Sequence, residues 1–202
     1  MADLITLEPF VRPYVGDCPI PLVTARTKEA AREFFEESRS WVESVSAVVD
    51  DGALTSIDDL PAGVVVVALS EARDTSNGKA LRKVESEEWI DNNKINNTIA
   101  VNLSGELVVK NIQGNRNLAV KFFVKPGLSG STVPDYLLDR WGEFIAAGAV
   151  ARLQAQPGVK WSNPNEVAFH LGRFRAGIAT ARTSIAGGYA DASVAASSPA
   201  FI

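Results

Sequence analysis

Two residue types that carry much of enzyme and metal chemistry are almost absent from this sequence. Its 202 residues include one cysteine, Cys18, and one histidine, His170. A single cysteine excludes an intrachain disulfide and any metal site built from several cysteines, and it suits a reducing cytosol. With one histidine, a metal site could be assembled only from scattered carboxylates. We therefore expect no catalytic residue, no metal and no cofactor.

The sequence favours structural roles for both residues. His170 falls beside the apolar stripe of a predicted helix, so a structural or interface histidine is favoured over a catalytic base. Cys18 has no histidine near it in the sequence, so a partly buried, unreactive thiol is favoured over a nucleophile. The acidic pairs at 50–51 and 58–59 flank turn residues without the spacing of a calcium loop, which indicates solvated loop acids.

Long hydrophobic runs are also absent. The longest, Val64 to Leu69, has the length of a strand, whereas a membrane span needs roughly 20 apolar residues. No basic and apolar signal pattern is present, so we expect a soluble protein that is not exported by that route. The net charge of −4 argues against a tight nucleic-acid binder, because such domains usually carry a basic face.

The clearest pattern in the sequence is a pair of long helices between residues 132 and 188. The first opens with Pro134 at its first helical position and stops before Pro157, and the second opens at Asn163 and Pro164 and ends at Gly187. The first helix carries an apolar stripe at steps of three and four: Leu138, Trp141, Ile145, Ala149 and Leu153. The second carries a similar stripe: Val167, Leu171, Phe174, Ile178, Ala181 and Ile185. The two patterns predict a helical hairpin.

A third helix is predicted from Thr27, as N-cap, to about Val45. Its apolar face comprises Ala31, Phe34, Phe35, Ser38, Trp41, Val42 and Val45. Its charged side is interpreted as solvated: Glu33, Glu36, Glu37, Arg39 and Glu43. The three helices are predicted to share a bundle core made of Phe34, Trp41, Trp141, Ile145, Leu171, Phe174 and Ile178.

Between the helices, from about Ser46 to Pro126, the hydrophobic period becomes that of strands. About five antiparallel strands are predicted, at 63–73, 79–84, 98–103, 106–112 and 118–125, with Asn77-Gly78 as the turn after the first. The polar stretch between the second and third strands holds a single predicted helical turn from Ser86. The chain is therefore predicted to be α+β, with residues 27–49 and 132–188 as a helical bundle and residues 50–131 as an inserted β domain.

The two ends of the sequence are predicted to be extended arms. Residues 1–26 contain four prolines among apolar residues, which favours an ordered, extended segment. Residues 189–202 carry little charge and end in Phe201-Ile202, so they are either a frayed terminus or an arm that orders by inserting into a partner.

Cations gather in the C-terminal half: Arg152, Lys160, Arg173, Arg175 and Arg182. Three interpretations remain open for them, namely phosphate contacts, an acidic partner surface, and salt bridges within the bundle. The glycine-rich stretch from Gly127 to Ser131 lacks the Lys-Ser/Thr ending of a phosphate loop, so an ordinary connector is favoured there over a nucleotide site.

Three segments of the helical half resemble the head-to-tail adaptor proteins of tailed bacteriophages. They are residues 33–41 (EFFEESRSW), residues 135–153 (DYLLDRWGEFIAAGAVARL), and residues 160–164 (KWSNP), the last leading into a helix with Phe174 and Gly177-Ile178. In that family the chain is a helical bundle with an inserted β domain. The β region of this sequence, from about Val64 to Lys125, carries none of the resemblance.

The resemblance implies a structural virion protein of the neck, made in the cytoplasm of a host bacterium. Such proteins assemble into a ring, commonly a dodecamer, that docks under the portal protein, extends the DNA channel and receives the next tail component. DNA passes through the channel without specific binding. The family's C-terminal segment typically reaches the portal, which assigns portal binding to the apolar residues of the last arm: Tyr189, Val194, Phe201 and Ile202. The alternative from a different class is a small cytosolic regulatory or nucleic-acid-binding module that uses the arginine-bearing last helix.

Overall fold

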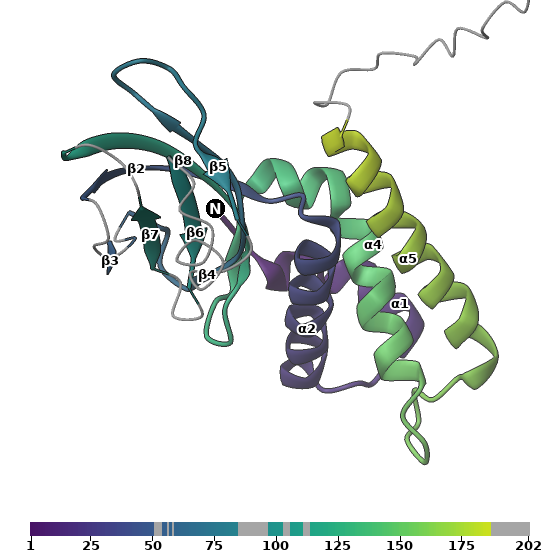
Figure 1. Ribbon diagram of the computed structural model, residues 1–202. Coiled ribbons are helices and arrows are strands. Elements are labelled where there is room, and N and C mark those ends of the chain that lie inside the picture. Colours follow the sequence, from purple (N-terminus) through teal and green to yellow (C-terminus); the bar gives the residue numbers. More distant parts are fainter. Residues whose placement is uncertain are drawn as a thin grey trace, which may run out of the picture.

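The computed structural model of the chain describes residues 1–50, 54–55, 57, 59–84, 97–102, 106–110 and 114–186. Within these ranges the protein is α+β (Figure 1). Its helices are the 3-10 helix η1 (Leu4–Leu7), α1 (Glu8–Val15), α2 (Ile20–Ser38), α4 (Asp135–Gln154) and α5 (Pro164–Ala186). Its strands are β1 (Ala2–Asp3), β2 (Val42–Val49), β3 (Leu54–Thr55), β4 (Val64–Asp74), β5 (Arg82–Lys83), β6 (Thr98–Val101), β7 (Leu107–Lys110), β8 (Arg116–Pro126) and β9 (Thr132–Val133).

Most of the first 26 residues are helical, so the predicted extended N-terminal arm is wrong. Helices η1 and α1 occupy Leu4 to Val15, and α2 already begins at Ile20. Pro9 and Pro21 lie in the first turns of α1 and α2, where the N–H that proline lacks would have no partner within the helix. Apolar side chains of η1 and α1, which pack against α4, are buried: Leu4, Leu7, Val11 and Val15.

Helix α2 also ends earlier than predicted, at Ser38. Arg39 takes a left-handed conformation with φ 55°, and its N–H bonds back to the last turn, which ends the helix. The valine-rich residues that follow form strand β2, because β-branched side chains suit a pleated sheet. Thr27, predicted as the N-cap, lies inside α2, and its hydroxyl donates to the Val23 carbonyl at 2.9 Å.

Helices α4 and α5 lie close to their predicted bounds and pack against each other. Pro134 is the N-cap of α4 rather than its first residue. Helix α5 begins at Pro164, and the Asn163 carbonyl before it accepts from the Glu166 N–H at 3.1 Å. Along the predicted stripe of α5, the buried residues are Phe174, Ile178 and Ala181. The partly buried residues are Val167, Leu171 and Ile185.

Aromatic side chains from α2, α4 and α5 form the centre of the helical part. The Phe34 ring centroid lies 6.0 Å from that of Trp141 and 6.1 Å from that of Phe174. Trp41, predicted on a helix, is buried from a position just before β2. The residues predicted for the bundle core are buried, except for the partly buried Leu171: Phe34, Trp41, Trp141, Ile145, Phe174 and Ile178.

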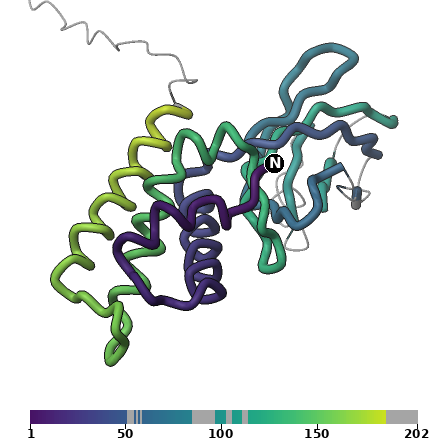
Figure 2. The backbone as a smooth tube through the Cα atoms, turned by 180° about the vertical axis from the view of Figure 1, so that it is seen from behind, coloured from purple at the N-terminus to yellow at the C-terminus, as the bar shows by residue number. Residues whose placement is uncertain are grey.

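Strands β2 to β8 form two sheets, with strand orders β2-β8-β4 and β3-β7-β6-β5, whereas β9 pairs antiparallel with β1. All pairs in these sheets are antiparallel except β5 with β6, which are parallel. Figures 1 and 2 show both sheets to one side of the helices, with α2 packed against β8. Apolar residues of both sheets belong to the hydrophobic core: Val45, Val49, Leu69, Ile99, Leu107, Val109, Leu118, Val120 and Phe122.

The predicted turn at Asn77-Gly78 follows β4. Gly78 has φ 69°, and its N–H donates to the Asp74 carbonyl at 2.8 Å. The chain then returns beside β4, where the Leu81 N–H donates to the Ala72 carbonyl at 2.9 Å. Beyond that bond it turns to pair with β6 in parallel, so the predicted antiparallel return strand is correct only near the turn.

Candidate functional site

A hollow of about 190 Å³ opens on the surface between α1, α4 and α5, and we call it the α1–α5 hollow. Two of its lining residues, Ala147 and Val150 of α4, are buried, whereas Phe10 of α1 is about half exposed. The hollow therefore has an apolar base and an aromatic side chain on its rim. Its lining residues are Phe10, Tyr14, Glu143, Ala147, Val150, His170 and Arg173.

His170 is the buried polar residue of this hollow, with 1% of its surface exposed. Its ring meets Tyr14 edge to face at a centroid distance of 4.7 Å and Phe169 at 5.2 Å. Nε2 lies 3.8 Å from the Glu166 carboxylate, whereas Nδ1 has no hydrogen-bond partner in the described part of the chain. Burial lowers the pKa of His170 below its ordinary value of 6.5, Glu166 opposes this, and Arg173 adds to it. The neutral, ring-packed imidazole suits a structural or interface residue.

Exposed aromatic side chains surround His170. Phe10 and Tyr14 lie one turn apart on α1 and are 49% and 44% exposed, and Phe169 on α5 is 62% exposed. Aromatic residues bury much surface at little entropic cost and are enriched at protein interfaces. The face of the molecule formed by α1 and α5 is therefore a candidate interaction surface.

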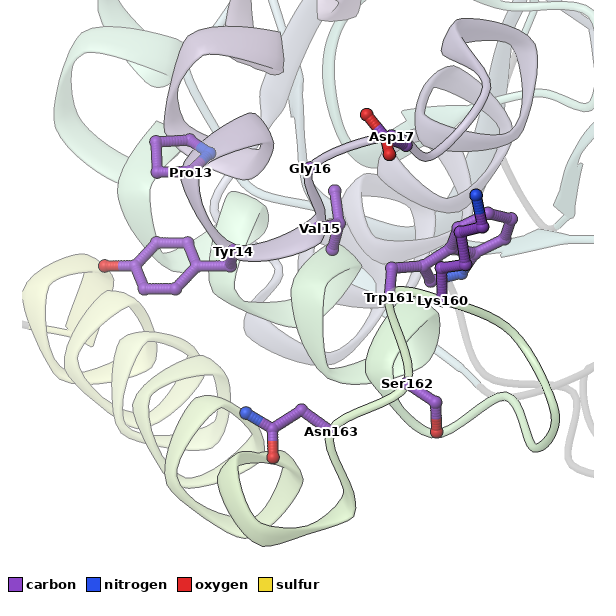
Figure 3. Close-up of a pocket in the computed structure, with 9 residues that line it drawn as sticks. All are labelled: Pro13, Tyr14, Val15, Gly16, Asp17, Lys160, Trp161, Ser162 and Asn163. Carbon is purple, nitrogen blue, oxygen red and sulfur yellow. The ribbon is translucent and has the colours of Figure 1, made fainter.

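A second, wider cleft of about 410 Å³ lies at the end of α1, beside the α4–α5 connection. Figure 3 shows Asp17 on one wall, with Lys160 and Trp161 side by side on another. The indole Nε1 donates to the Gln156 side chain at 3.3 Å, which holds the tryptophan in place. One carboxylate, one ammonium and one indole suit contact with a protein segment better than nucleophilic chemistry, which requires a nucleophile beside a base.

Cys18 is more deeply buried than predicted, with 1% exposed. Burial raises the pKa of its thiol, and the nearby Arg12 opposes this only in part. Because the thiolate is the reactive form, this environment makes Cys18 a poor nucleophile.

Salt bridges within the helical part account for three of the C-terminal arginines. Each of the three pairs with an acid on a neighbouring helix: Arg152 with Glu33, Arg173 with Glu143, and Arg182 with Glu37. Lys160 and Arg175 form no ion pair with any described residue. Exposed pairs of this kind contribute about 0 to 1 kcal/mol each, so they orient side chains more than they stabilise the fold.

The acidic side of α2 is not simply solvated. Its glutamates are about half exposed, yet they connect α2 to three other elements: Glu33 to α4, Glu36 to Lys125 of β8, and Glu37 to α5. Glu43 lies on β2 and accepts from the Trp41 indole at 2.6 Å. The predicted solvated face is therefore exposed at Glu33, Glu36, Glu37 and Arg39, although its glutamates also form ion pairs, and the prediction is wrong for Glu43, which lies on β2.

The glycine-rich stretch after β8 is a packed connector. The Gly127 N–H donates to the Gly63 carbonyl at 2.7 Å, and the Gly130 N–H donates to the Gly127 carbonyl at 3.2 Å. A Cβ on Gly130 would collide with the Gly63 carbonyl oxygen. Close approach of two backbones explains these glycines without a bound anion.

Several predictions fall outside the described residues. The helical turn from Ser86 to Ile90 and the acids Asp51 and Asp58 lie there. So do the residues to which portal binding was assigned: Tyr189, Val194, Phe201 and Ile202.

A scan against protein-family models and a search of the curated proteins found no match to this chain. None of the described helices is both long and apolar enough to cross a membrane. The described ranges also contain no group of three or more His, Cys, Asp or Glu side chains placed to share a metal ion. Geometry alone thus makes the α1–α5 hollow the leading candidate for a functional surface.

The lowered pKa of His170 predicts a loss of stability in mild acid. In the unfolded chain the histidine binds a proton near pH 6.5, whereas in the folded protein burial lowers its pKa. The contribution of the neutral His170 to the free energy of unfolding is therefore full above pH 6.5 and decreases as the pH falls below that value. Thermal midpoints measured between pH 7.5 and 5.5 should fall further for the wild type than for His170→Gln. Equal falls in both proteins would show that His170 is not responsible.

Proposed function

We propose that the protein is a non-enzymatic structural virion protein, a ring-forming head-to-tail adaptor that docks under the portal, extends the DNA channel and receives the tail. Its partners are further copies of itself, the portal protein and the next tail component. Its place is the neck of the virion.

One observation carries this proposal: the three segments that resemble the adaptor family form one packed unit. Residues 33–41 include the end of α2 and the link to β2, residues 135–153 make up nearly all of α4, and residues 160–164 lead into α5. The Phe34 and Trp141 rings join the first two segments. The Asn163 N–H donates to the Gln154 carbonyl at 3.1 Å and joins the third to the end of α4. Segments distant in sequence thus pack together.

The finer architecture belongs to the same proposal. Helices α1, α2, α4 and α5 are taken as one bundle, and the sheets between α2 and α4 as a domain inserted into it. The chain leaves the helices after Ser38 and returns to them at Asp135, which supports this division. Strand β2, within the residues first assigned to the bundle, belongs with the sheets.

The nucleic-acid-binding alternative receives less support from the arginines. Arg152 and Arg182 pair with acids of α2, and Arg173 pairs with Glu143 of α4. Among the arginines of α5, Arg175 alone has no ion pair to a described residue, so the last helix does not present a row of unpaired cations to phosphates. The net charge of −4 also suits a channel that must let DNA pass.

Electron micrographs and mass measurements of the purified protein, alone and mixed with portal, test the proposal. A closed ring of many copies, or a complex with portal, is the expected result. A monomer or dimer that ignores portal and binds DNA with steep salt dependence would instead support the regulatory module.

Truncation after Gly188 is expected to abolish portal binding while leaving the helical circular-dichroism spectrum unchanged. The described helix α5 ends at Ala186, so its packing against α4 remains intact. The removed apolar residues Tyr189, Val194, Phe201 and Ile202 are proposed as the portal contact, and ring symmetry multiplies the effect of each copy. Sedimentation with portal measures the outcome. If the truncated protein bound portal as well as the full chain, the portal contact would have to lie on the helical bundle.

A further inference from the structure

Leu128 is the most exposed large apolar side chain among the described residues, at 84%. It stands at the tip of the turn at residues 127–131, which we call the Leu128 turn. The turn is held tightly, because Gly127 bonds to Gly63 and the Gly130 backbone packs against the Gly63 carbonyl. The Ser131 carbonyl also accepts from the Leu4 N–H at 2.8 Å. A tightly held turn thus exposes a leucine side chain to water, where the side chain gives the fold no stabilisation by burial.

A rigid apolar side chain is well suited to fill a pocket, because little conformational entropy is lost when it binds. The α1–α5 hollow, at about 190 Å³, has room for one such side chain and is smaller than the usual small-molecule pocket. Ala147 and Val150 provide an apolar base, and Phe10 and Tyr14 provide aromatic walls. The charged lining residues Glu143 and Arg173 are 67% and 38% exposed, so their charged ends can stay in water at the rim when an apolar side chain enters. The buried His170 has a lowered pKa, which favours the neutral imidazole beside that side chain.

The turn and the hollow lie on different sides of the molecule. Figures 1 and 2 both show the turn at residues 127–131 on the sheet side of α2, whereas α5 lies on the other side of α2. A contact between two different patches of the same chain is heterologous and repeats from copy to copy, giving a ring when the rotation closes.

We infer that the Leu128 turn of one copy inserts into the α1–α5 hollow of the next. This inference rests on the proposed function, since it names the contact between neighbouring copies in the proposed ring. Charge agrees with it: the exposed Asp59 lies four residues before Gly63, whose carbonyl holds the turn, and Arg173 lines the hollow. Arg173 pairs with Glu143 at 3.4 Å, and the two side chains are 38% and 67% exposed. A solvent-facing pair of this kind is weak, so Arg173 can also contact an acid of a neighbouring copy.

Two single substitutions separate the two halves of the contact. Leu128→Asp alters the turn and leaves the hollow intact, whereas Phe10→Glu alters the hollow and leaves the turn intact. Both positions are exposed, so both variants should fold. Val48→Asp, 64% exposed on β2, is the matched control.

Sedimentation and mass measurement of full-length protein, with and without portal, give the test. Each of the two variants should lose the ring, with association weakened roughly 10-fold or more per contact, while Val48→Asp keeps it. An equimolar mixture of the two should form dimers but no rings. The intact turn of Phe10→Glu can enter the intact hollow of Leu128→Asp, and the altered turn and altered hollow that remain cannot bind a further copy. Leu128→Cys mixed with Phe10→Cys should give a covalent dimer on oxidation, and the buried Cys18 should not react.

The outcomes distinguish the two proposals. Rings that persist in Leu128→Asp or Phe10→Glu, or a cysteine pair that fails to cross-link within a ring, would overturn this contact and leave the adaptor function standing. A wild-type chain that forms no ring, alone or with portal, would overturn both.

Discussion

Replacing Phe174 with alanine is expected to lower the free energy of unfolding by about 3 to 5 kcal/mol, the typical cost of deleting a buried aromatic ring. The ring is fully buried and lies in the aromatic centre beside Phe34. It also packs so closely on α4 that a Cβ on Gly148 would lie 2.5 Å from its Cδ2. The guanidinium of Arg152 lies over the Phe174 ring, 5.1 Å from the ring centroid. The substitution therefore leaves a cavity where three elements meet.

Thermal or urea unfolding followed by circular dichroism measures this effect. A midpoint lower by roughly 10 °C is expected for a chain of this size. Phe169→Ala is the matched control, since Phe169 lies on the same helix but is 62% exposed, and it should change stability by about 0.5 kcal/mol or less. Equal small shifts in both variants would place Phe174 on the surface and contradict the packing of α5.

The helices near the C-terminus could be predicted from the sequence because their ends carry local signals. Pro134, Asn163 and Pro164 mark starts, and the apolar stripes have a helical period over many residues. Such signals depend on neighbours in the chain, so they are readable without the fold. The strands near residues 64–74 and 116–126 could be predicted for the same reason, from the strand-like period of their hydrophobic residues and from the turn at Gly78.

The N-terminal helices could not be predicted in this way because proline has two opposite meanings. Four prolines among the first residues favour an extended chain, yet Pro9 and Pro21 occupy helix first turns, where proline is tolerated. Only burial of side chains such as Val11 and Val15 against α4 decides between the two. That contact joins parts of the chain too far apart to be visible in a local pattern.

The change from α2 to β2 was hidden by a coincidence of spacing. Phe34, Ser38, Trp41 and Val45 follow helical steps, so the stripe seems to continue, while Val42 to Val49 also suits a strand. Pairing with β8 decides for the strand, and a long-range partner of this kind overrides local propensity.

The candidate surface shows the same division between local and tertiary information. The sequence singled out His170 and placed it beside a core stripe. It gave no sign that Tyr14 meets His170, or that Phe10 and Arg173 line the same hollow, because α1 itself was missed. An amphipathic reading of residues 8–15, with exposed Phe10 and Tyr14 four residues apart, was the available signal.

Substituting Gly130 with alanine is expected to cost about 3 kcal/mol of stability, at the upper end for overpacking, because the collision is with backbone rather than with a side chain that could rotate. The new Cβ would overlap the Gly63 carbonyl oxygen, which already accepts from the Gly127 N–H at 2.7 Å. Relief requires the turn to move away from Gly63, just before the start of β4, which breaks that bond and shifts Leu128. The measurement is the unfolding midpoint beside that of Ser129→Ala, an exposed neighbour in the same turn that should change stability by at most about 0.5 kcal/mol. Since the turn is proposed to enter the next copy, Gly130→Ala should also weaken association at temperatures where the protein remains folded. A variant as stable as Ser129→Ala would mean that the turn is loosely held, and the preorganisation ascribed to Leu128 would be wrong.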